Sequence, residues 1–425
     1  MSVAVALGAP ARLRADTCIK GSCVDGQGMS IFPGGGSYEG GFRKGRYDGK
    51  GSLIYDDGGS YEGELKAGRP DGKGSKTWPN GEKYVGEFKD GRREGRGTWT
   101  DADGRKHSGG WRNNLLHGKA VATEKGGNVY EGDFVNGTKE GHGVMRFRSG
   151  VVYDGAWRDN QYEGKGKLTL TDGERYEGDF RNGLYEGYGS TKLANGGSYV
   201  GEFKRGKWQG KGELRRADGL HYVGEFENGF FEGHGTLAYI DGGTYTGEFH
   251  LGRREGKGIL TLPDKTRYEG NFKNDMQDGE GKSFYADGSV YVGALRNGKR
   301  EGKGSLDRRD GQKYFGEFRN DYFDGKGQLA IPGNGVFEGD FRNGKRDGDG
   351  KTALPSGAVL TAQYRGGLLD GSFTMRLPDG GLLRGEFRYG LGSGLWSLMS
   401  PKGERREWQA KDAIPKELEP LFRGL

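Results

Sequence analysis

A 23-residue pattern recurs along most of this chain and never slips by a residue. The residues reached by stepping 23 at a time from Tyr38 are mostly tyrosines, and the exceptions are His107, Phe337, Leu360 and Leu383. Sixteen such units fill residues 38–405, a degenerate half-unit fills 15–37, and tails remain at 1–14 and 406–425. A repeat of this length predicts a solenoid-like array in which each unit packs only against its neighbours.

Within the unit, numbered from its tyrosine as position 1, the residue types predict a β-hairpin. Aromatic residues at positions 1 and 5 flank a glycine at position 3, so they share one face of a strand. An Asn-Gly or Asp-Gly pair near positions 7 and 8 is typical of a tight turn, and further glycines recur at positions 12 and 14. Isolated hairpins are marginal, so each unit needs its neighbours to cover its rings.

Opposite charges predict how the two strands of a hairpin align. Folding the unit between positions 8 and 9 sets an acidic position 4 opposite a lysine at 13, and a basic position 6 opposite an acidic 11. The same alignment sets Gly155 opposite Gly166 and Trp157 opposite Gly164. Each ion pair contributes only about 0.2–1 kcal/mol, but a one-residue slip would move all of them to the ring face. We expect the rings to lie over the paired glycines and to stack on rings of adjacent units.

The composition fits a thin structure held together by a few large side chains. Glycine supplies 89 of 425 residues, whereas aromatic residues supply 12%, which is too many for a disordered chain. Glycine does not fall at every third residue, which excludes collagen. The net charge of +6 is too small and too mixed to indicate nucleic-acid binding. The sequence has no apolar run near the roughly 20 residues of a membrane helix.

The two cysteines, Cys18 and Cys23, cannot brace a chain of 425 residues. Two free thiols in a reducing compartment are the favoured interpretation, and a bond between them is the alternative.

The sequence predicts no catalytic, cofactor-binding or metal site. The stretch Gly348–Thr352 resembles a phosphate-binding loop, but its upstream Gly344 is one residue too far away. The six histidines are spread over five units without ligand spacing, and no serine or cysteine has the neighbourhood of a nucleophile. We therefore expect a non-enzymatic protein.

The unit pattern Y-x-G-x-F-x-x-G-x-x-x-G-x-G-x-L resembles the MORN repeat (membrane occupation and recognition nexus) over about nine-tenths of the chain. The resemblance implies antiparallel hairpins side by side in one long twisted single-layer sheet. At about 10 Å per unit, sixteen units would form an all-β rod of about 150 Å. Departures in the fourth unit indicate a kink, a contact site or mere sequence drift, and those in the last two units indicate capping units. The residues are His107, Asn114, Ala120, Leu360, Ala362, Phe373, Leu383 and Trp396.

Positions 9 and 10 are the hairpin tips, which the fold does not fix, so we expect partners to be recognised there. An aromatic ladder at position 10, predicted to bind an extended segment or a helix of a partner, consists of Tyr162, Tyr185, Trp208 and Phe231. The alternative is that these rings fold back on their own hairpins. Basic tips that could contact acidic protein tails or lipid headgroups, or simply be solvated, are Arg92, Arg93, Arg253, Arg254, Lys299 and Arg300.

The resemblance extends these expectations to function. Stand-alone arrays of this family recur in cilia, including radial spokes, and in protist scaffolds. We expect a cytoplasmic, cytoskeletal scaffold that bridges proteins of a microtubule-based assembly, most plausibly the ciliary or flagellar axoneme. The alternative is a peripheral membrane adaptor that binds acidic phospholipids, such as phosphoinositides, through the basic tips. Related scaffolds imply a homodimer through the terminal repeats. Residues 406–425 are expected to cap the last ring layer, and the alternative is that they form a partner-binding peptide.

Overall fold

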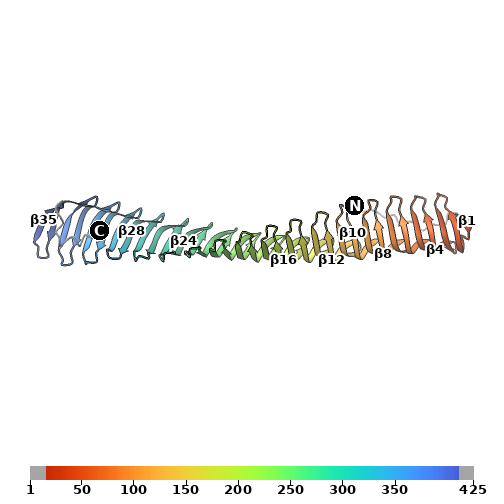
Figure 1. Cartoon of the computed structure of the whole chain (residues 1–425), viewed down its shortest axis with the longest axis horizontal. Helices are drawn as coiled ribbons and strands as arrows, with labels where there is room; N and C mark the ends of the chain where they lie inside the picture. The colour runs from red at the N-terminus through yellow and green to blue at the C-terminus, as the bar shows by residue number, and fades with distance from the viewer. Residues whose placement is uncertain (1–15, 411–425) are drawn as a thin grey trace. The chain divides into compact units, whose positions relative to one another are not determined.

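The computed structural model describes residues 16–410, which form two compact units, one ending at Trp208 and the other beginning at Gln209. The described residues form 35 strands and no helix, which confirms the predicted all-β class (Figure 1). No helix in this range is long and apolar enough to cross a membrane.

The strands that begin in the N-terminal unit are β1 (Thr17–Gly21), β2 (Gly26–Ile31), β3 (Ser37–Arg43), β4 (Arg46–Ile54), β5 (Ser60–Lys66), β6 (Arg69–Thr77), β7 (Lys83–Lys89), β8 (Arg92–Thr100), β9 (Lys106–Arg112), β10 (Leu115–Thr123), β11 (Val129–Val135), β12 (Thr138–Arg146), β13 (Val152–Arg158), β14 (Gln161–Thr169), β15 (Arg175–Arg181), β16 (Leu184–Lys192), β17 (Ser198–Lys204) and β18 (Lys207–Arg215).

The strands that begin in the C-terminal unit are β19 (His221–Glu227), β20 (Phe230–Ala238), β21 (Thr244–His250), β22 (Arg253–Thr261), β23 (Arg267–Lys273), β24 (Met276–Phe284), β25 (Val290–Arg296), β26 (Lys299–Asp307), β27 (Lys313–Arg319), β28 (Tyr322–Ile331), β29 (Gly335–Arg342), β30 (Lys345–Ala353), β31 (Val359–Arg365), β32 (Leu368–Arg376), β33 (Leu382–Arg388), β34 (Leu391–Met399) and β35 (Arg405–Gln409).

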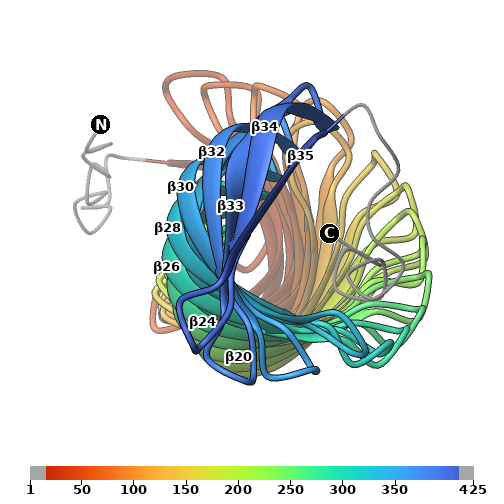
Figure 2. The same ribbon diagram turned by 90° about the vertical axis from the view of Figure 1, so that its left-hand side faces the viewer.

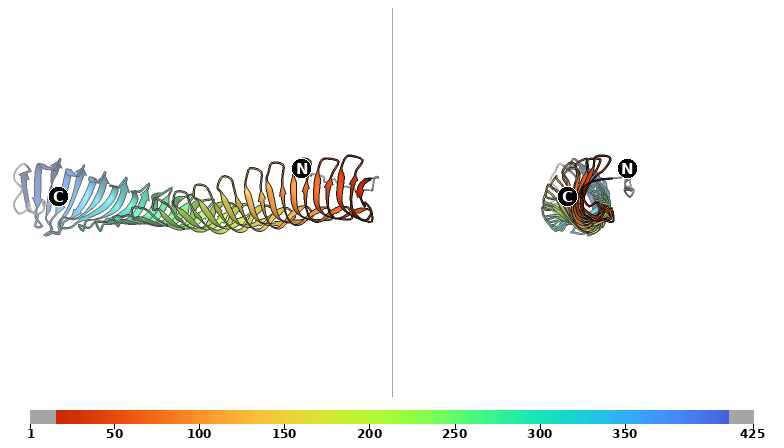
Figure 3. Two further views of the ribbon diagram at one scale, coloured as in Figure 1. Left: turned by 45° about the vertical axis from the view of Figure 1, so that its right-hand side comes forward. Right: turned by 90° about the vertical axis from the view of Figure 1, so that its right-hand side faces the viewer.

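Each unit is an open antiparallel sheet in which strands pair in chain order. In the N-terminal unit β13 pairs with β14 and β14 with β15, and the hairpins follow one another side by side (Figure 3). In the C-terminal unit β27, β28 and β29 pair in the same way (Figure 2). The short turns within hairpins therefore lie along one edge of each sheet, and the longer connections between hairpins along the other.

The predicted strand alignment is right for one half of the hairpin and wrong for the half next to the turn. Tyr153 pairs with Leu168 and Gly155 with Gly166, as expected. Trp157, however, pairs with Tyr162 and not with Gly164, because a bulge around positions 11–13 absorbs two residues.

Glycine is required at position 12 because the bulge gives it a positive φ. Gly164 has φ +69° and Gly233 φ +57°, values that a residue with a Cβ adopts only at a cost. The residues at positions 7 and 8 also have positive φ, for example Asn182 (+49°) and Gly183 (+79°), which identifies a tight turn of the primed type. The predicted turn is confirmed at these two positions.

The core of each unit is a layer of rings laid over glycines. Tyr153 is fully buried, and its hydroxyl donates to the Ala156 carbonyl oxygen at 2.7 Å. A Cβ added at Gly155 or Gly166 would lie 2.6 or 2.5 Å from that hydroxyl, so only glycine leaves room for the ring. The ring also packs edge-on against Phe180 of the next hairpin, with centroids 5.1 Å apart. The expected ring-over-glycine packing is confirmed.

The last two units fill the core in a different way: the large side chain is at position 14 and not at position 1. Where position 1 is Leu360, the glycine of position 14 is replaced by Phe373, and where it is Leu383, by Trp396; all four are buried. In the fourth unit the smaller ring of His107 leaves room for Ala120, which pairs with Gly109.

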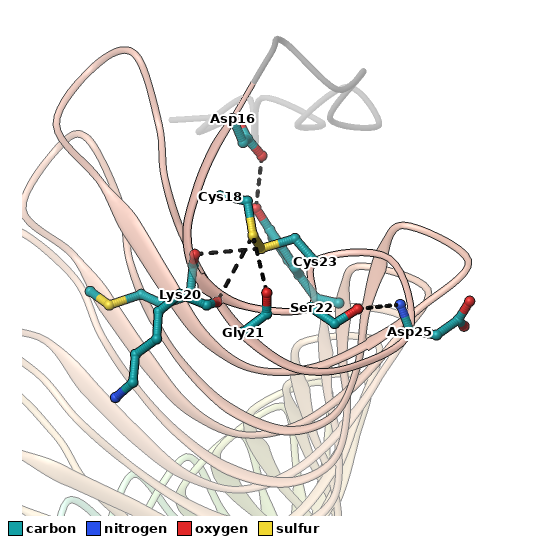
Figure 4. Close-up of a disulfide and its surroundings, with 9 residues drawn as sticks. Asp16, Cys18, Lys20, Gly21, Ser22, Cys23 and Asp25 are labelled. Carbon is teal, nitrogen blue, oxygen red and sulfur yellow. Dashed lines mark hydrogen bonds between the residues drawn. A yellow bond between two sulfur atoms is a disulfide. The ribbon is translucent and has the colours of Figure 1, made fainter.

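The favoured interpretation of Cys18 and Cys23 as free thiols is wrong, because the two form a disulfide (Figure 4). Cys18 lies in β1 and Cys23 in the turn that leads to β2, so the short turn holds the two sulfurs together. Beside the disulfide, the Tyr47 hydroxyl hydrogen-bonds the Asp16 carboxylate at 3.0 Å.

At the end of the chain, β35 pairs with β34, and Trp408 packs against Trp396. The rest of the predicted capping tail, residues 411–425, lies outside the described residues.

Candidate interaction surfaces

The four rings of the predicted ladder each pack onto the tyrosine at position 1 of their own hairpin. The stacked pairs and their centroid distances are Tyr153 and Tyr162 (3.7 Å), Tyr176 and Tyr185 (3.7 Å), Tyr199 and Trp208 (4.7 Å), and Tyr222 and Phe231 (3.8 Å). These rings therefore fold back on their own hairpins and belong to the ring layer, as the alternative interpretation of the sequence has it. Their backbone is opposite position 5, and the bulge turns their side chains onto the ring face.

One face of these rings remains at the surface, since Tyr162, Tyr185 and Phe231 are half-buried. Burial raises the pKa of Tyr162 to about 12, so its phenol is neutral. The partner-binding role of the ladder stays a prediction.

Half of the predicted basic tips have partners inside the sheet. The guanidinium groups of Arg93, Arg254 and Arg300, all at position 10, lie over Trp111 at 4.5 Å, Phe272 at 5.4 Å and Phe318 at 5.3 Å. These arginines therefore occupy the place that the ladder rings take in other hairpins.

A basic residue at position 10 is coupled to the turn of the next hairpin. Four of the five basic residues at position 10, namely Arg93, Lys139, Arg254 and Arg300, are followed by Asn114, Asn160, Asp275 and Asp321 at position 8 of the next turn, whereas Arg346 is followed by Gly367. The Oδ1 atom of Asp275 accepts the backbone N–H of Arg254 at 2.9 Å, and Arg300 and Asp321 repeat the contact at 3.0 Å. Because both Arg254 and Arg300 also ion-pair with that aspartate at 3.3 and 3.2 Å, much of their charge is already balanced.

The remaining three predicted cations, Arg92, Arg253 and Lys299, are at position 9, the first residue of the strand after the turn. All three are exposed, although Arg92 and Arg253 donate to Asn113 and Asn274 of the next turn at 3.0 and 3.2 Å. Position 9 is thus the part of the hairpin edge where side chains meet solvent.

The acidic residues that the charge pattern assigned to cross-strand pairs have a second role. The Glu94 carboxylate at position 11 accepts the backbone N–H of Asn113, at position 7 of the next turn, at 2.9 Å. The same contact over 19 residues recurs in both units, for example from Asn182 to Glu163 and from Asn320 to Glu301, both at 3.1 Å. Each hairpin thereby holds the turn of its successor.

Three further ion pairs locate the predicted charges. Arg158 at position 6 reaches Glu163 at position 11 at 3.7 Å, as expected. Lys165 at position 13 pairs with Asp179 of the next hairpin at 2.8 Å, and the backbones of these two residues are directly opposite. Position 4 of its own hairpin is the uncharged Ala156. In the C-terminal unit, the His250 Nδ1 atom lies 2.8 Å from Glu232, and this hydrogen bond raises the pKa of the imidazole.

A hollow of about 620 Å³ lies on the ring face of the C-terminal unit. It is lined mainly by charged and polar side chains, including Arg300, Arg308, Asp287 and Asp310. Within residues 16–410, no three His, Cys, Asp or Glu side chains gather as they would around a metal ion.

Comparison with known proteins places this architecture in a family. A model described as the MORN repeat matches fourteen consecutive stretches: 38–60, 61–83, 84–104, 107–126, 130–152, 153–175, 176–198, 199–221, 222–244, 245–267, 268–290, 291–313, 314–336 and 337–359. Hairpins β31–β32 and β33–β34 follow these matches. No curated protein matches the chain.

Among solved structures, the chain is similar to the TCP10 domain of Danio rerio CPAP in complex with a peptide of Danio rerio STIL. The two share 14% identity over 58% of this chain and 95% of that chain, with a TM-score of 0.26. The SAS-4 (dCPAP) TCP domain of Drosophila melanogaster, in complex with a proline-rich motif of Ana2 (dSTIL), shares 15% identity over 47% and 89%, with a TM-score of 0.21. Such low scores carry no argument about function.

The family model covers well over half of the chain, and the hairpins have the ring and glycine packing that its pattern predicts. The chain therefore belongs to the MORN-repeat family, whose repeats form protein-interaction scaffolds.

Proposed function

We propose that this protein is a non-enzymatic scaffold that bridges proteins in a microtubule-based cytoskeletal assembly, specifically the axoneme of cilia or flagella, in radial spokes or a related structure. The observation that carries the proposal is the regular succession of hairpins, each held to the next through backbone and turn contacts. Such a succession presents position-9 side chains at a constant interval, which suits a protein that holds several partners at set distances.

The axonemal location is tested by expressing a tagged copy in ciliated cells and removing the membrane with detergent. We expect the tag to remain on the isolated axoneme, in a complex with axonemal proteins. A tag that leaves with the detergent-soluble membrane fraction would contradict the location.

The second candidate, a membrane adaptor for acidic phospholipids, depends on the basic tips. Its support is the exposure of Arg253 and Lys299, whereas Arg254 and Arg300 are already paired within the sheet. Sedimentation with phosphoinositide vesicles at physiological salt tests it, and loss of binding in the Arg253→Gln, Lys299→Gln variant would support it.

We also propose a homodimer through the terminal repeats. A chain ending at Gly357 is expected to be monomeric by light scattering, whereas the full chain is dimeric. If both have the same mass per particle, the terminal repeats do not form the interface.

A further inference from the structure

The side chains at position 9 of seven consecutive hairpins in the C-terminal unit alternate between apolar and basic. In chain order these residues, which we call the alternating row, are Phe230, Arg253, Met276, Lys299, Tyr322, Lys345 and Leu368. Each is the first residue of the second strand of its hairpin, β20 through β32. The row therefore runs along the turn edge of the sheet.

The members of the row lie in solvent rather than in the ring layer. The four apolar side chains, Phe230, Met276, Tyr322 and Leu368, are 53%, 50%, 57% and 52% exposed, and the three cations are also exposed. By contrast, Phe231 and Phe323, one residue further along, stack on the tyrosines of their own hairpins. Packing therefore does not require apolar residues at position 9.

The fold does not require alternation either. In the N-terminal unit the same position is occupied by three consecutive arginines, Arg46, Arg69 and Arg92, in hairpins that pair in the same way. The alternation in the C-terminal unit is thus a property of the surface, and it places exposed apolar and basic side chains in turn along one edge.

The surroundings of the row favour an acidic partner. Across the hairpin, the residues directly paired with Lys299, Tyr322 and Lys345 are Arg296, Arg319 and Arg342. Arg319 and Arg342 each reach an aspartate, at 3.2 and 3.7 Å, while the row itself carries only positive charge. Complementary charge on the partner would both orient it and speed its association.

The spacing of the row selects the conformation of that partner. Successive hairpins are two strands apart, or about 9.6 Å at 4.8 Å per strand. A polyproline-II segment advances about 9.3 Å in one turn of three residues, so its every third residue faces the next hairpin. Over six steps the mismatch is about 2 Å. An α-helix advances about 10.5 Å in seven residues, which accumulates about 5 Å and also rotates the contact stripe.

We propose that the alternating row binds an extended, polyproline-II segment of a protein partner that carries apolar and acidic side chains at alternate third positions. The carboxylates meet Arg253, Lys299 and Lys345, and the apolar groups lie on the four apolar members. A fluid lipid surface gains nothing from strict alternation, which is why a protein segment is favoured. The inference rests on the scaffold character of the chain and not on its location in an axoneme.

The test uses the full chain and a fluorescent peptide with four copies of Leu-Pro-Pro-Glu-Pro-Pro, measured by fluorescence anisotropy. A second peptide has the same composition, with leucine and glutamate two residues apart. We expect the first peptide to bind at least ten times more tightly. The variant Arg253→Glu, Lys299→Glu, Lys345→Glu should lose at least tenfold, and so should Met276→Ser with Tyr322→Ser.

The matched control is the variant Arg46→Glu, Arg69→Glu, Arg92→Glu, which reverses the same number of charges at the same position in the N-terminal unit. It should bind the peptide as the unaltered chain does, and circular dichroism should show each variant folded. Equal affinity for both peptides, equal loss in the control variant, or no binding would overturn the proposal. So would anionic vesicles that bind through the row when the peptide does not.

Discussion

In the hairpin of β31 and β32 the large ring is at position 14 and leucine is at position 1. We expect that this arrangement can be transferred to a hairpin that has the usual tyrosine at position 1 and glycine at position 14. In the hairpin of β23 and β24, Tyr268 is buried over Gly281, and position 10 is Gln277, so no stacked ring complicates the test. Replacing this pair by leucine and phenylalanine would copy Leu360 and Phe373, which fill the same space in the hairpin of β31 and β32.

Each single change should be costly, for a different reason. Tyr268→Leu removes a buried ring and the hydroxyl that donates to the Asn271 carbonyl at 3.0 Å, for a loss of about 2–4 kcal/mol. In Gly281→Phe the new Cβ would overlap the Tyr268 ring, and its three nearest heavy atoms all belong to that ring, for a loss of about 3 kcal/mol. Because each change removes the obstacle to the other, the double variant should recover about 3 kcal/mol of their summed loss.

Repeat arrays can open locally, so the measurement is hydrogen exchange resolved to peptides that cover residues 262–300, with urea unfolding of the whole chain beside it. The control is Gly270→Phe with Tyr268→Leu. A Cβ at Gly270 also meets the Gly281 Cα at 2.6 Å and the Glu280 carbonyl at 2.7 Å, which no side-chain change removes. If the loss in the Tyr268→Leu, Gly281→Phe variant equals the sum of its single losses, the compensation between positions 1 and 14 is refuted.

Three further outcomes follow from the packing and charges. Phe231→Ser should lower the local unfolding free energy by about 2 kcal/mol, whereas the neighbouring Phe230→Ser changes it by less than about 0.5; equal effects in hydrogen exchange would contradict the stacked placement of Phe231. Gly164→Ala should cost about 1–2 kcal/mol through its positive φ alone, since the nearest atom to a new Cβ is 3.6 Å away, and Gly164→Asn should cost less in the same urea assay. Glu232 hydrogen-bonds and attracts the imidazole, which raises the pKa of His250 above 6.5, so the pair stabilises the fold below that pH and loses the effect as pH rises through the raised value. Burial raises the pKa of Glu232, but the hydrogen bonds from the Leu251 N–H and from His250 outweigh burial and lower this pKa below 4.5. The pair therefore also weakens as pH falls through the lowered pKa of Glu232. An NMR titration of His250 that is unchanged by Glu232→Gln would exclude the pair.

The sequence predicts the hairpin, the turn and the ring layer because each depends on a side chain at a fixed place in the unit. The packing of Tyr153 over Gly155 and Gly166 can be predicted from the spacing of these residues alone, because successive side chains of a strand point to opposite faces. The bulge is not, because glycine at position 12 serves equally well as a flat strand residue or as one with positive φ. The signal for the bulge is that position 12 is glycine in all sixteen units, which a flat strand does not require.

The predicted alignment contains no bulge, and this accounts for the errors at the candidate surface. In the predicted alignment Trp157 faces Gly164, so position 10 extends past the paired strands and a ring there reaches solvent. In the structure Trp157 faces Tyr162, so the turn beyond the last paired residues is two residues shorter than in the predicted alignment. The rings therefore return to the core, while the residues at position 9 remain outside. The disulfide has a separate explanation. The free-thiol interpretation depends on the redox compartment alone, whereas the five-residue separation of Cys18 and Cys23 allows the turn before β2 to bring the two sulfurs together.

The constancy of the 23-residue period has a cause within the fold itself. Each turn depends on its predecessor at two points: the N–H of position 8 donates to the carbonyl of position 10, as from Gly183 to Tyr162 at 3.0 Å, and the N–H of position 7 donates to position 11, as from Asn182 to Glu163. One inserted residue between two hairpins would break both contacts, flip the following strand and expose its rings. These contacts within the fold are therefore enough to explain the constant register. The fold does not determine the residue type at position 9, and the alternation there from Phe230 to Leu368 is the basis of the proposed binding of an extended segment.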